Sequence, residues 1–482
     1  MKKTALSLLL AAAALLSACG AAPATAPSAT PTPDPAAAAE STPDPAAAAE
    51  PTPEPQNGDF YALDRLNAAF NSGDAYYEFA QKLGYCLLLK TDYATATQTV
   101  CCEIPGCTHD TETCPAYFPG KHYYVPFVAQ GQLYVLNASF FMEDGDMAWE
   151  DFYAQRVAPQ LENPSETFDG MSGQEIEKYY YGLWQQQKTA MRLYAVNPAG
   201  ENTYQDLPKE CHEAVFDYCD GTSLYGMVTS GAQGQNKEII RVSLADGSME
   251  TMTLESTEEW KGVYDGALLT MRYVTDAPLP DDWEQYIAAL QSATVEFDRY
   301  DPRTGERRKL AERPYNERNI YDNDYTGTHN GKLYFSRWET NPQDGTEQNL
   351  FVQYDPADGS TVTIWDKTPA DNLQLPYNYT NDLPPCEHRT ERWLWLSGSS
   401  GWSQDVFALL DTETFAITPV TQKIQNDPEG WDVYRLAQTS DGLWLIVTEE
   451  SDNGNPSAYA LIAPEALAAG STDWTPVTMW QG

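Results

Sequence analysis

The sequence predicts an all-β fold, a β-propeller of four-stranded antiparallel blades, and three observations carry this prediction. Short runs rich in aromatic and β-branched residues alternate with turn residues along the chain, most clearly in residues 330–365. The unit recurs with a period of roughly 40 to 60 residues once two inserts are set aside, which is the range of propeller blades. Seven hairpin motifs can be counted, so seven blades are expected, with six or eight as alternatives.

Residues 330–365 show the unit in its most complete form. The first apolar run is Leu-Tyr-Phe at 333–335, the second surrounds Phe351, and a β-branched run at 361–365 follows the turn sequence Asp-Pro-Ala-Asp-Gly. Short apolar runs bounded by Gly, Pro, Asn or Asp are typical of strands joined by tight turns. Because a ring of antiparallel blades hides the long strand edges, a propeller fits a chain this rich in strand signals.

The two halves of this unit recur independently. The Leu-Tyr-Phe strand has counterparts at 133–135, 224–225, 268–269, 393–395 and 443–445, and the hairpin half has counterparts beginning at 85, 193, 239, 295, 406 and 459. Inserts at 140–188 and 281–293 contain apolar residues at helical spacing. Both interrupt the unit between its strand and its hairpin, and equivalent loops of a propeller emerge on one side. We therefore expect the two inserts on the same face of the ring.

Composition excludes one class of partner. Of 482 residues 42% are hydrophobic, which is ample for a large core, and the net charge is −41. Phosphate binding requires the opposite sign, so no nucleic-acid partner is expected. Past the N-terminus, no apolar run approaches the length of a membrane span.

The N-terminus has the features of a secretory signal. Two lysines follow Met1, residues 5–16 are apolar, and small residues precede Cys19. Leu-Ser-Ala-Cys resembles the lipobox of bacterial lipoproteins, which implies that residues 1–18 are removed and that Cys19 carries the lipid. Two acyl chains give stable membrane anchoring where one is marginal. The alternative is an ordinary signal peptide with a chance cysteine.

Residues 19–58 are expected to form a tether. They consist mainly of Ala, Pro, Thr and acidic residues, with a nine-residue direct repeat that begins at Thr32 and Thr42, and no side chain there could form a core. The folded domain is therefore expected at 59–482, on the extracytoplasmic face of the cell membrane. A tether of this length favours a Gram-positive owner, whose cell wall is thick.

One segment is dense in metal-ligating side chains. Cys102, Cys107, His109 and Cys114 form the pattern C-x4-C-x-H-x4-C within 13 residues. Three thiolates and an imidazole are enough donors for a closed tetrahedral zinc site. A loop this short has no core of its own, so a bound zinc ion would supply its order.

Two alternatives to zinc stay open at this stage. Disulfide bonds are natural outside the cytoplasm, and the candidate partners are Cys86, Cys101, Cys211, Cys219 and Cys386. The eight cysteines besides Cys19 are an even number, as disulfide bonding requires, but no bridge explains the histidine between the thiols. The second alternative is free thiols.

The cysteine segment resembles one in a group of propeller-like extracytoplasmic lipoproteins of anaerobic gut Clostridia, in which a lipobox and a tether precede it. The shared positions are Cys102, Pro105, Cys107, His109, Cys114, Ala116 and Tyr117. Val100-Cys101 stands where a leucine is usual. The resemblance implies a fold and a cellular address, and it implies no activity.

Two function classes follow from these patterns. The favoured one is a binding or scaffolding domain for an unknown glycan, peptide or protein, and the alternative is an enzyme acting on glycans or peptides. No catalytic residue is assigned, since Gly-x-Ser-x-Gly is absent. A close, partly buried carboxylate pair in a cleft would favour the enzyme.

Tryptophans outside the strand motifs are candidates for a binding face, whereas those within them should pack in the core. The first set is Trp149, Trp184, Trp283, Trp402 and Trp431, and the second is Trp365, Trp393, Trp395 and Trp444.

Overall fold

The computed structural model describes residues 58–482 apart from 66–67, 122, 139–146, 166–167, 169, 189–190, 231–235, 255–256, 281, 316–323, 341–342, 368–371, 375–391, 400–404, 426–431 and 450–457. The chain divides into two units, Met1–Pro51 and Thr52–Gly482, and all described residues belong to the second. The expected signal segment, Cys19 and most of the expected tether lie outside the described residues.

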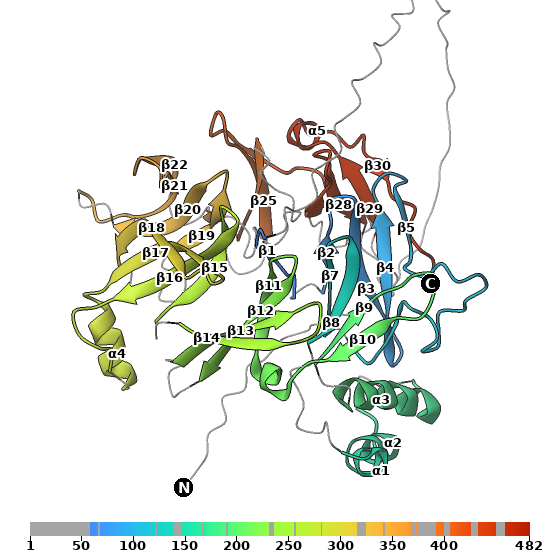
Figure 1. Cartoon of the computed structure of the whole chain (residues 1–482). Helices are drawn as coiled ribbons and strands as arrows, with labels where there is room; N and C mark the ends of the chain where they lie inside the picture. The colour runs from blue at the N-terminus through green and yellow to red at the C-terminus, as the bar shows by residue number, and fades with distance from the viewer. Residues whose placement is uncertain are drawn as a thin grey trace, which may run out of the picture. The chain divides into compact units, whose positions relative to one another are not determined.

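The described part of the chain forms seven antiparallel sheets, one after another in sequence, arranged as a β-propeller (Figure 1). The prediction of seven blades is therefore confirmed. Blades 1 and 2 contain β2 (Phe70–Asn71), β3 (Ala75–Lys82), β4 (Tyr85–Asp92), β5 (Thr97–Val100) and β6 (Tyr117–Pro119), then β7 (Tyr124–Ala129), β8 (Gln132–Asn137), β9 (Arg192–Ala195) and β10 (Thr203–Asp206). Blades 3 and 4 contain β11 (Val215–Cys219), β12 (Ser223–Ser230), β13 (Asn236–Ser243) and β14 (Met249–Thr253), then β15 (Glu259–Tyr264), β16 (Ala267–Val274), β17 (Thr294–Asp301) and β18 (Glu306–Pro314). Blades 5 to 7 contain β19 (Tyr325–His329), β20 (Lys332–Thr340), β21 (Glu347–Tyr354) and β22 (Thr361–Lys367), then β23 (Asn372–Gln374), β24 (Trp393–Ser399), β25 (Asp405–Asp411) and β26 (Ile417–Pro419), then β27 (Tyr434–Gln438), β28 (Trp444–Glu449), β29 (Ala458–Ile462) and β30 (Thr475–Pro476).

The hydrophobic core lies between neighbouring blades, and the first strands of neighbouring blades contact one another toward the centre of the ring. Phe297 of blade 4 packs edge-on against Phe335 of blade 5, with ring centroids 5.5 Å apart. Trp395 of blade 6 and Trp444 of blade 7 meet in the same manner, at 5.9 Å, and both are buried. These two tryptophans are core residues, as predicted. Trp393 is half-buried against the same cluster, and the side chain of Trp365 lies outside the described residues.

Both predicted inserts contain helices. The first, between β8 and β9, holds α1 (Trp149–Phe152), a π-helical turn (Tyr153–Val157), α2 (Ala158–Glu162) and α3 (Gly173–Lys188), and the second, between β16 and β17, holds α4 (Trp283–Leu290). Further short helices are the 3-10 helix Lys209–Glu213 and α5 (Pro464–Ala468). Both inserts join the second and third strands of their blades, so they emerge at equivalent edges, as expected, and Figure 1 shows them along its lower side. The α1–α2 stretch was not predicted from the sequence.

The residues that enter the propeller first contact blades 3 and 4. Strand β1 (Tyr61–Ala62) pairs with β11, the first strand of blade 3, and Phe60 N donates to Gly266 O at 3.2 Å. Leu63 is fully buried there, and the chain then reaches blade 1 through β2. Gly266 lies in the turn between the first two strands of blade 4, so the chain enters at the edge opposite to the helical inserts.

Among the described residues, blade 1 is built from the N-terminal part of the chain and blade 7 from the C-terminal part, and the two share no strand. Hydrogen bonds join the two instead. Thr478 is bonded through its backbone to Ala96 and Gln98 of blade 1, at 2.8 and 2.9 Å. Asn71 Nδ2 donates to Gln438 O at 2.6 Å. We call this contact between blades 1 and 7 the seam.

Glu78 is a titratable group at the seam. Its carboxylate oxygens accept hydrogen bonds from Tyr459 Oη at 2.9 Å and from Gln98 Nε2 at 2.8 Å. Burial nevertheless raises the pKa of Glu78 from 4.5 to about 7, because the two hydrogen bonds only partly offset the loss of hydration. Between these values the folded protein keeps a proton that the unfolded chain releases. The free energy of unfolding therefore falls as pH rises through this window.

Glu78→Gln is expected to remove this pH dependence and to keep an acceptor for Tyr459. Relative to the variant, the wild type should lose up to about 1.4 kcal/mol per pH unit between about pH 4.5 and 7. Urea unfolding of both proteins across that range measures the difference. Glu284→Gln, at an exposed position on α4, is the control. If the free energy of unfolding depends on pH in the same way in the wild type and in Glu78→Gln, the raised pKa of Glu78 is contradicted.

Candidate functional site

The segment with the four candidate metal ligands interrupts the outermost strand of blade 1. Strands β5 and β6 both pair with β4, and residues 101–116 run between them. Cys101 N donates to Leu88 O and Leu88 N donates to Ala116 O, both at 2.9 Å. Residues 102–115, hereafter the cysteine loop, therefore form a loop, and the residues at its two ends are hydrogen-bonded to the backbone of Leu88.

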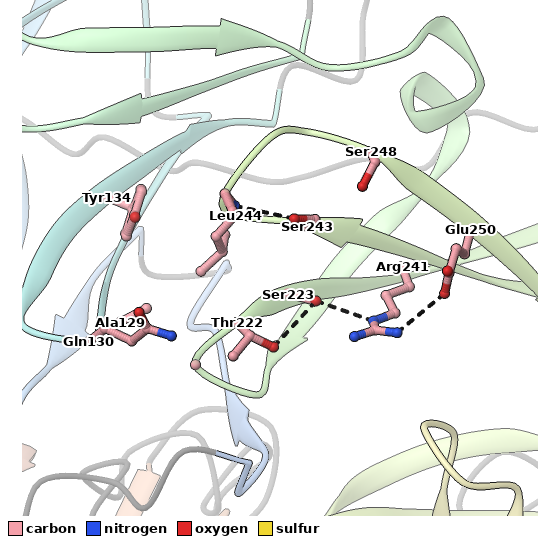
Figure 2. A pocket seen from close by; sticks show the side chains of 12 residues that line it. Ala129, Gln130, Tyr134, Thr222, Ser223, Arg241, Ser243, Leu244, Ser248 and Glu250 are labelled. Carbon is pink, nitrogen blue, oxygen red and sulfur yellow. Dashed lines mark hydrogen bonds and ion pairs between the residues drawn. The ribbon is translucent and has the colours of Figure 1, made fainter.

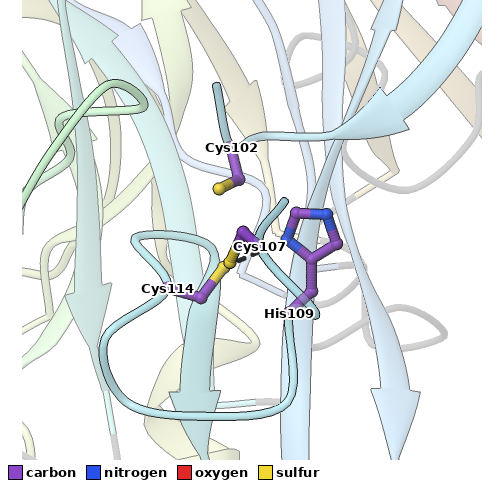
Figure 3. A group of neighbouring side chains, drawn as sticks. All are labelled: Cys102, Cys107, His109 and Cys114. Carbon is purple, nitrogen blue, oxygen red and sulfur yellow. Dashed lines mark hydrogen bonds between the residues drawn. The ribbon is translucent and has the colours of Figure 1, made fainter. Parts of the chain in front are cut away.

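The cysteine loop brings the four predicted ligands together. The Sγ atoms of Cys102, Cys107 and Cys114 and a ring nitrogen of His109 all lie within 4.8 Å of one another (Figure 3). His109 Nδ1 lies 3.3 Å from Cys114 Sγ, so Nδ1 is the ring nitrogen that faces the cluster. In a tetrahedral Cys/His zinc site the donor atoms lie roughly 3.3 to 3.8 Å apart, because each is about 2.0 to 2.3 Å from the ion. Small inward shifts would suffice, and the cluster could hold a metal ion.

The backbone of the cysteine loop is shaped to aim these donors. Two tight turns place Cys107 N 3.2 Å from Ile104 O and Cys114 N 3.0 Å from Thr111 O. His109 has φ +61°, a left-handed conformation that few residues other than glycine adopt. Residues held in such conformations cluster at functional sites, where the surroundings must compensate the strain.

Burial sets the electrostatics of the cluster. Cys114 is buried and the other three ligands are half-buried. Burial raises the pKa of Cys114 to about 12 and also raises that of Cys102. Four protein donors complete a tetrahedron and leave no open position for substrate, which is the pattern of structural rather than catalytic zinc sites.

Three of the other described cysteines have contacts outside the cluster. Cys86 Sγ contacts Gln81 Oε1 at 3.4 Å, Cys211 Sγ contacts Met249 Sδ at 3.6 Å, and Cys219 accepts from Gly221 N at 3.3 Å. None of the seven cysteines in the described part of the chain forms a disulfide. Cys386, the remaining candidate partner in the folded domain, lies outside the described residues.

Blade 2 and its insert hold the cysteine loop from outside. Pro198 O accepts from Glu103 N, and Asn202 Nδ2 donates to Pro115 O, both at 2.7 Å. From α3, Gln185 Nε2 donates to Glu112 Oε1 at 2.5 Å. The loop is therefore fixed against two segments that are distant in sequence.

The backbone of helix α3 packs directly against the backbone of blade 1. A Cβ added to Gly182 would lie 1.8 Å from the carbonyl oxygen of Gly84, so only glycine fits at this crossing. Gln186, which is 2% exposed, donates to Lys121 O and accepts from Lys121 N, both at 2.9 Å. These contacts fix α3 beside the cysteine loop.

A cavity of about 540 Å³, hereafter the aromatic pocket, lies between the cysteine loop, α3 and the outer strands of blade 2. Its aromatic lining is Tyr117, Tyr181, Trp184, Tyr194 and Tyr204, and its polar lining includes Glu112, Gln185, Arg192, Glu201 and Asn202. Cys114 lines it as well, so the candidate metal cluster and the pocket share a wall. The volume is in the range of small-molecule sites.

A second cavity, of about 370 Å³, lies between blades 2 and 3 (Figure 2). It is lined by the turns that follow β7, β11 and β13, and Tyr134 is its aromatic residue. Arg241 bonds Glu250 at 3.2 Å and Ser223 Oγ at 3.2 Å across it. Its polar groups are thus largely engaged with one another.

Blade 4 contains the buried carboxylates that could have indicated an enzyme. Glu258 and Asp298 are at most 1% exposed. Arg307 bonds Glu258 at 2.7 Å and Asp298 at 3.0 Å, and Arg272 lies 3.3 Å from Asp298. Burial raises the pKa of Asp298, although both arginines oppose this shift. These residues line neither of the two cavities described above, and Arg272 and Arg307 balance the charge of the two carboxylates.

The candidate tryptophans divide between the inserts. Trp149 and Trp184 pack against each other with centroids 5.5 Å apart, and Trp184 lines the aromatic pocket. Trp283 is 47% exposed on α4, away from that pocket. Trp402 and Trp431 lie outside the described residues. The sequence did not single out Tyr181 and Tyr204, whose exposed side chains also line the pocket. The run of three tyrosines at 179–181 was the one signal in the sequence.

The fold and site together define a seven-bladed propeller with a four-donor Cys/His cluster beside an aromatic pocket. No protein-family model and no curated protein matches the sequence. Among solved structures, the β-propeller domain of the trilobed protease from Pyrococcus furiosus is 7% identical over 88% of this chain and 99% of that chain, with a TM-score of 0.43. An oligogalacturonate lyase in complex with manganese is 12% identical over 57% of this chain and 69% of that chain, with a TM-score of 0.35. At these values no function transfers, and the propeller assignment rests on the seven sheets of this chain.

Proposed function

We propose that this chain is a lipid-anchored, extracytoplasmic binding or scaffolding propeller whose cysteine loop is ordered by zinc. The observation that carries the binding role is the aromatic pocket, a cavity of about 540 Å³ whose walls are fixed by hydrogen bonds from three separate segments. Its ligand class is a glycan, a peptide or a segment of another protein. The net charge of −41 argues against nucleic acid.

Zinc is the metal that the donor set favours. Thiolates are soft ligands, and a tetrahedral arrangement of three sulfurs and one imidazole suits zinc better than magnesium, calcium or manganese, which prefer oxygen. Zinc bound by Cys102, Cys107, His109 and Cys114 would order the cysteine loop itself, and this loop forms one wall of the aromatic pocket. The role assigned to the metal is therefore structural.

The enzyme alternative has weaker support. The buried carboxylates of blade 4 are neutralised by Arg272 and Arg307. Glu112 and Glu201 line the aromatic pocket but are exposed, whereas the general acid of a glycosidase needs an apolar setting.

Incubation of the zinc-loaded protein with a panel of polysaccharides and peptides, followed by measurement of retention and of released products, tests the binding role against the enzyme. Retention of intact material supports the binding role. Release of shortened saccharides or peptides would establish the enzyme instead.

The location is proposed from the sequence. Cys19 follows a lipobox-like segment, and the tether after it carries no core-forming residues. Among the described residues, none of the helices combines the length and apolarity needed to cross a bilayer. At residue 58 the chain meets Arg303, in a turn at the edge opposite to the helical inserts.

Cys19→Ala is expected to release the protein from the membrane into the medium. A thioether-linked diacyl group requires the cysteine sulfur, and without it no stable anchor remains. Fractionation of cells that produce the wild type or the variant, followed by detection of the propeller in membrane and medium, measures the effect. Cys386→Ala is the matched control. Membrane retention of Cys19→Ala equal to that of the control would disprove lipidation.

A further inference from the structure

We infer that the aromatic pocket binds a neutral oligosaccharide, with the rings of Tyr181 and Tyr204 as stacking surfaces. This inference rests on the proposed binding function and adds the site and the ligand class. Three observations on the described residues support it: the exposed rings, the charge of the lining and the rigidity of the walls.

The first support is the exposure of two rings in one cavity. Among the described residues, five large hydrophobic side chains are exposed, and Tyr181 and Tyr204 are two of them, at 42% and 57%. They come from α3 and β10, segments that only the fold brings together. Exposed aromatic rings in a concave site offer flat apolar faces, and the carbon–hydrogen faces of sugar rings match such surfaces.

The second support is the charge of the lining. Arg192 is the only cationic side chain of the pocket among the described residues. It is bonded to Asp206 at 2.6 Å and lies 3.8 Å above the ring of Tyr204. With Arg192 neutralised, Glu112 and Glu201 leave the lining acidic, which disfavours an anionic ligand.

A neutral saccharide suits the polar groups that remain. Its hydroxyl groups can donate to the carboxylates of Glu112 and Glu201, and they can both donate to and accept from the side-chain amides of Gln185 and Asn202. A cationic peptide would also match the acidic lining, but lysine side chains present no flat apolar face to the two exposed rings. The combination of stacking faces and uncharged hydroxyl groups favours the saccharide.

The third support is the rigidity of the walls. Gln185 and Asn202 are each bonded to the cysteine loop, at 2.5 and 2.7 Å, so their positions are set before any ligand arrives. Gly182 and Gln186 fix α3 on blade 1. A site with fixed polar groups loses less entropy on binding, which matters for saccharides because each individual contact is weak.

The test is calorimetric titration of the full zinc-loaded chain with four hexamers of matched length. Cellohexaose and mannohexaose are the neutral probes, hexagalacturonate is the anionic probe and hexalysine is the cationic peptide probe. We expect a neutral hexaose to bind with a Kd below about 1 mM and at least about tenfold more tightly than hexagalacturonate or hexalysine.

Tyr204→Ala and Tyr181→Ala should each weaken that binding by about tenfold, since each removes one stacking face. Tyr204→Phe keeps the ring and should bind within about twofold of the wild type. Trp283→Ala, which removes an equally exposed aromatic residue outside the pocket, should leave binding unchanged. Circular dichroism confirms that the variants fold.

Three outcomes would overturn the inference: neither neutral hexaose binds, a charged probe binds more tightly than both, or Tyr204→Ala and Tyr181→Ala bind as tightly as Trp283→Ala. If the two tyrosine variants still bind intact saccharide as tightly as Trp283→Ala does, the proposed binding function stands, but the binding site lies outside the aromatic pocket. Cleavage of a hexaose would instead refute the proposed binding function. If that cleavage were lost in Tyr204→Ala, the site and the saccharide would still be supported.

Discussion

Cys107→Ser is expected to abolish tight zinc binding. The wild-type protein, purified without a histidine tag, should hold about one zinc ion per chain, because its three thiols and one imidazole converge within 4.8 Å. Serine is a poor zinc ligand, so the variant keeps only three effective donors. Its zinc content after dialysis against a chelator should fall to about a tenth of the wild-type value or less. Elemental analysis by mass spectrometry measures the content.

Cys101→Ala is the matched control for this experiment. Cys101 adjoins Cys102 in the sequence but is not a member of the cluster, so its replacement should leave the zinc content unchanged. Limited proteolysis adds a second measurement. Without metal, the cysteine loop of Cys107→Ser should be cut faster than that of the control, since the ion closes a loop that has no core of its own.

A wild-type protein that holds no metal would contradict this prediction. A thiol count under denaturing conditions then separates the two remaining alternatives: no reactive thiols would establish disulfides, and a full count would establish free cysteines. Equal zinc content in Cys107→Ser and Cys101→Ala would also exclude the proposed ligand set.

Arg307→Leu is expected to cost about 3 to 5 kcal/mol in the free energy of unfolding. The guanidinium group donates hydrogen bonds to Glu258 Oε2 and Asp298 Oδ2 and forms an ion pair with Glu258 Oε1, and these two residues are at most 1% exposed. Its removal leaves two buried carboxylates without their main counter-charge. Such groups must either stay charged at a high desolvation cost or take up protons, and both lower stability at neutral pH.

Arg308→Leu provides the comparison within the same strand. Arg308 is 56% exposed, and its partner Asp265, 3.6 Å away, is 64% exposed. A solvent-exposed pair of this kind contributes at most about 1 kcal/mol. Urea-induced unfolding of both variants at pH 7 measures the two losses. Similar losses would mean that the blade 4 network is not structural, and its carboxylates would then return as candidates for catalysis.

The strands and the convergence of the four candidate donors could be predicted because their signals are local. Residues 333–335 form a continuous buried run in β20, and in β17 the buried Val295 and Phe297 flank the half-buried Glu296, and both patterns are typical of strands. The four donors of the cluster lie within 13 residues, so even a short loop can bring them together. Where donors are close in sequence, their spacing limits how far apart they can be.

The aromatic pocket could not be predicted, since its walls come from three segments that approach one another only in the fold. Tyr181 belongs to a helix in an insert, Tyr204 to the last strand of blade 2, and Glu112 to a loop of blade 1. The sequence marked Trp184 as a candidate for binding, but nothing in it distinguishes an exposed tyrosine from one that packs in a core. Exposure depends on which neighbours cover a ring, and these are set by blade-to-blade packing.

The sequence by itself determined the propeller class, the seven repeats, the helical inserts and the set of candidate metal ligands, because each depends on the period or spacing of nearby residues. Only the tertiary structure decided that β1 pairs with blade 3, that Arg307 neutralises Glu258 from a strand about fifty residues away, and that blades 1 and 7 join without a shared strand. These contacts join residues far apart in the chain. Their geometry is fixed by closure of the ring, which no local pattern encodes.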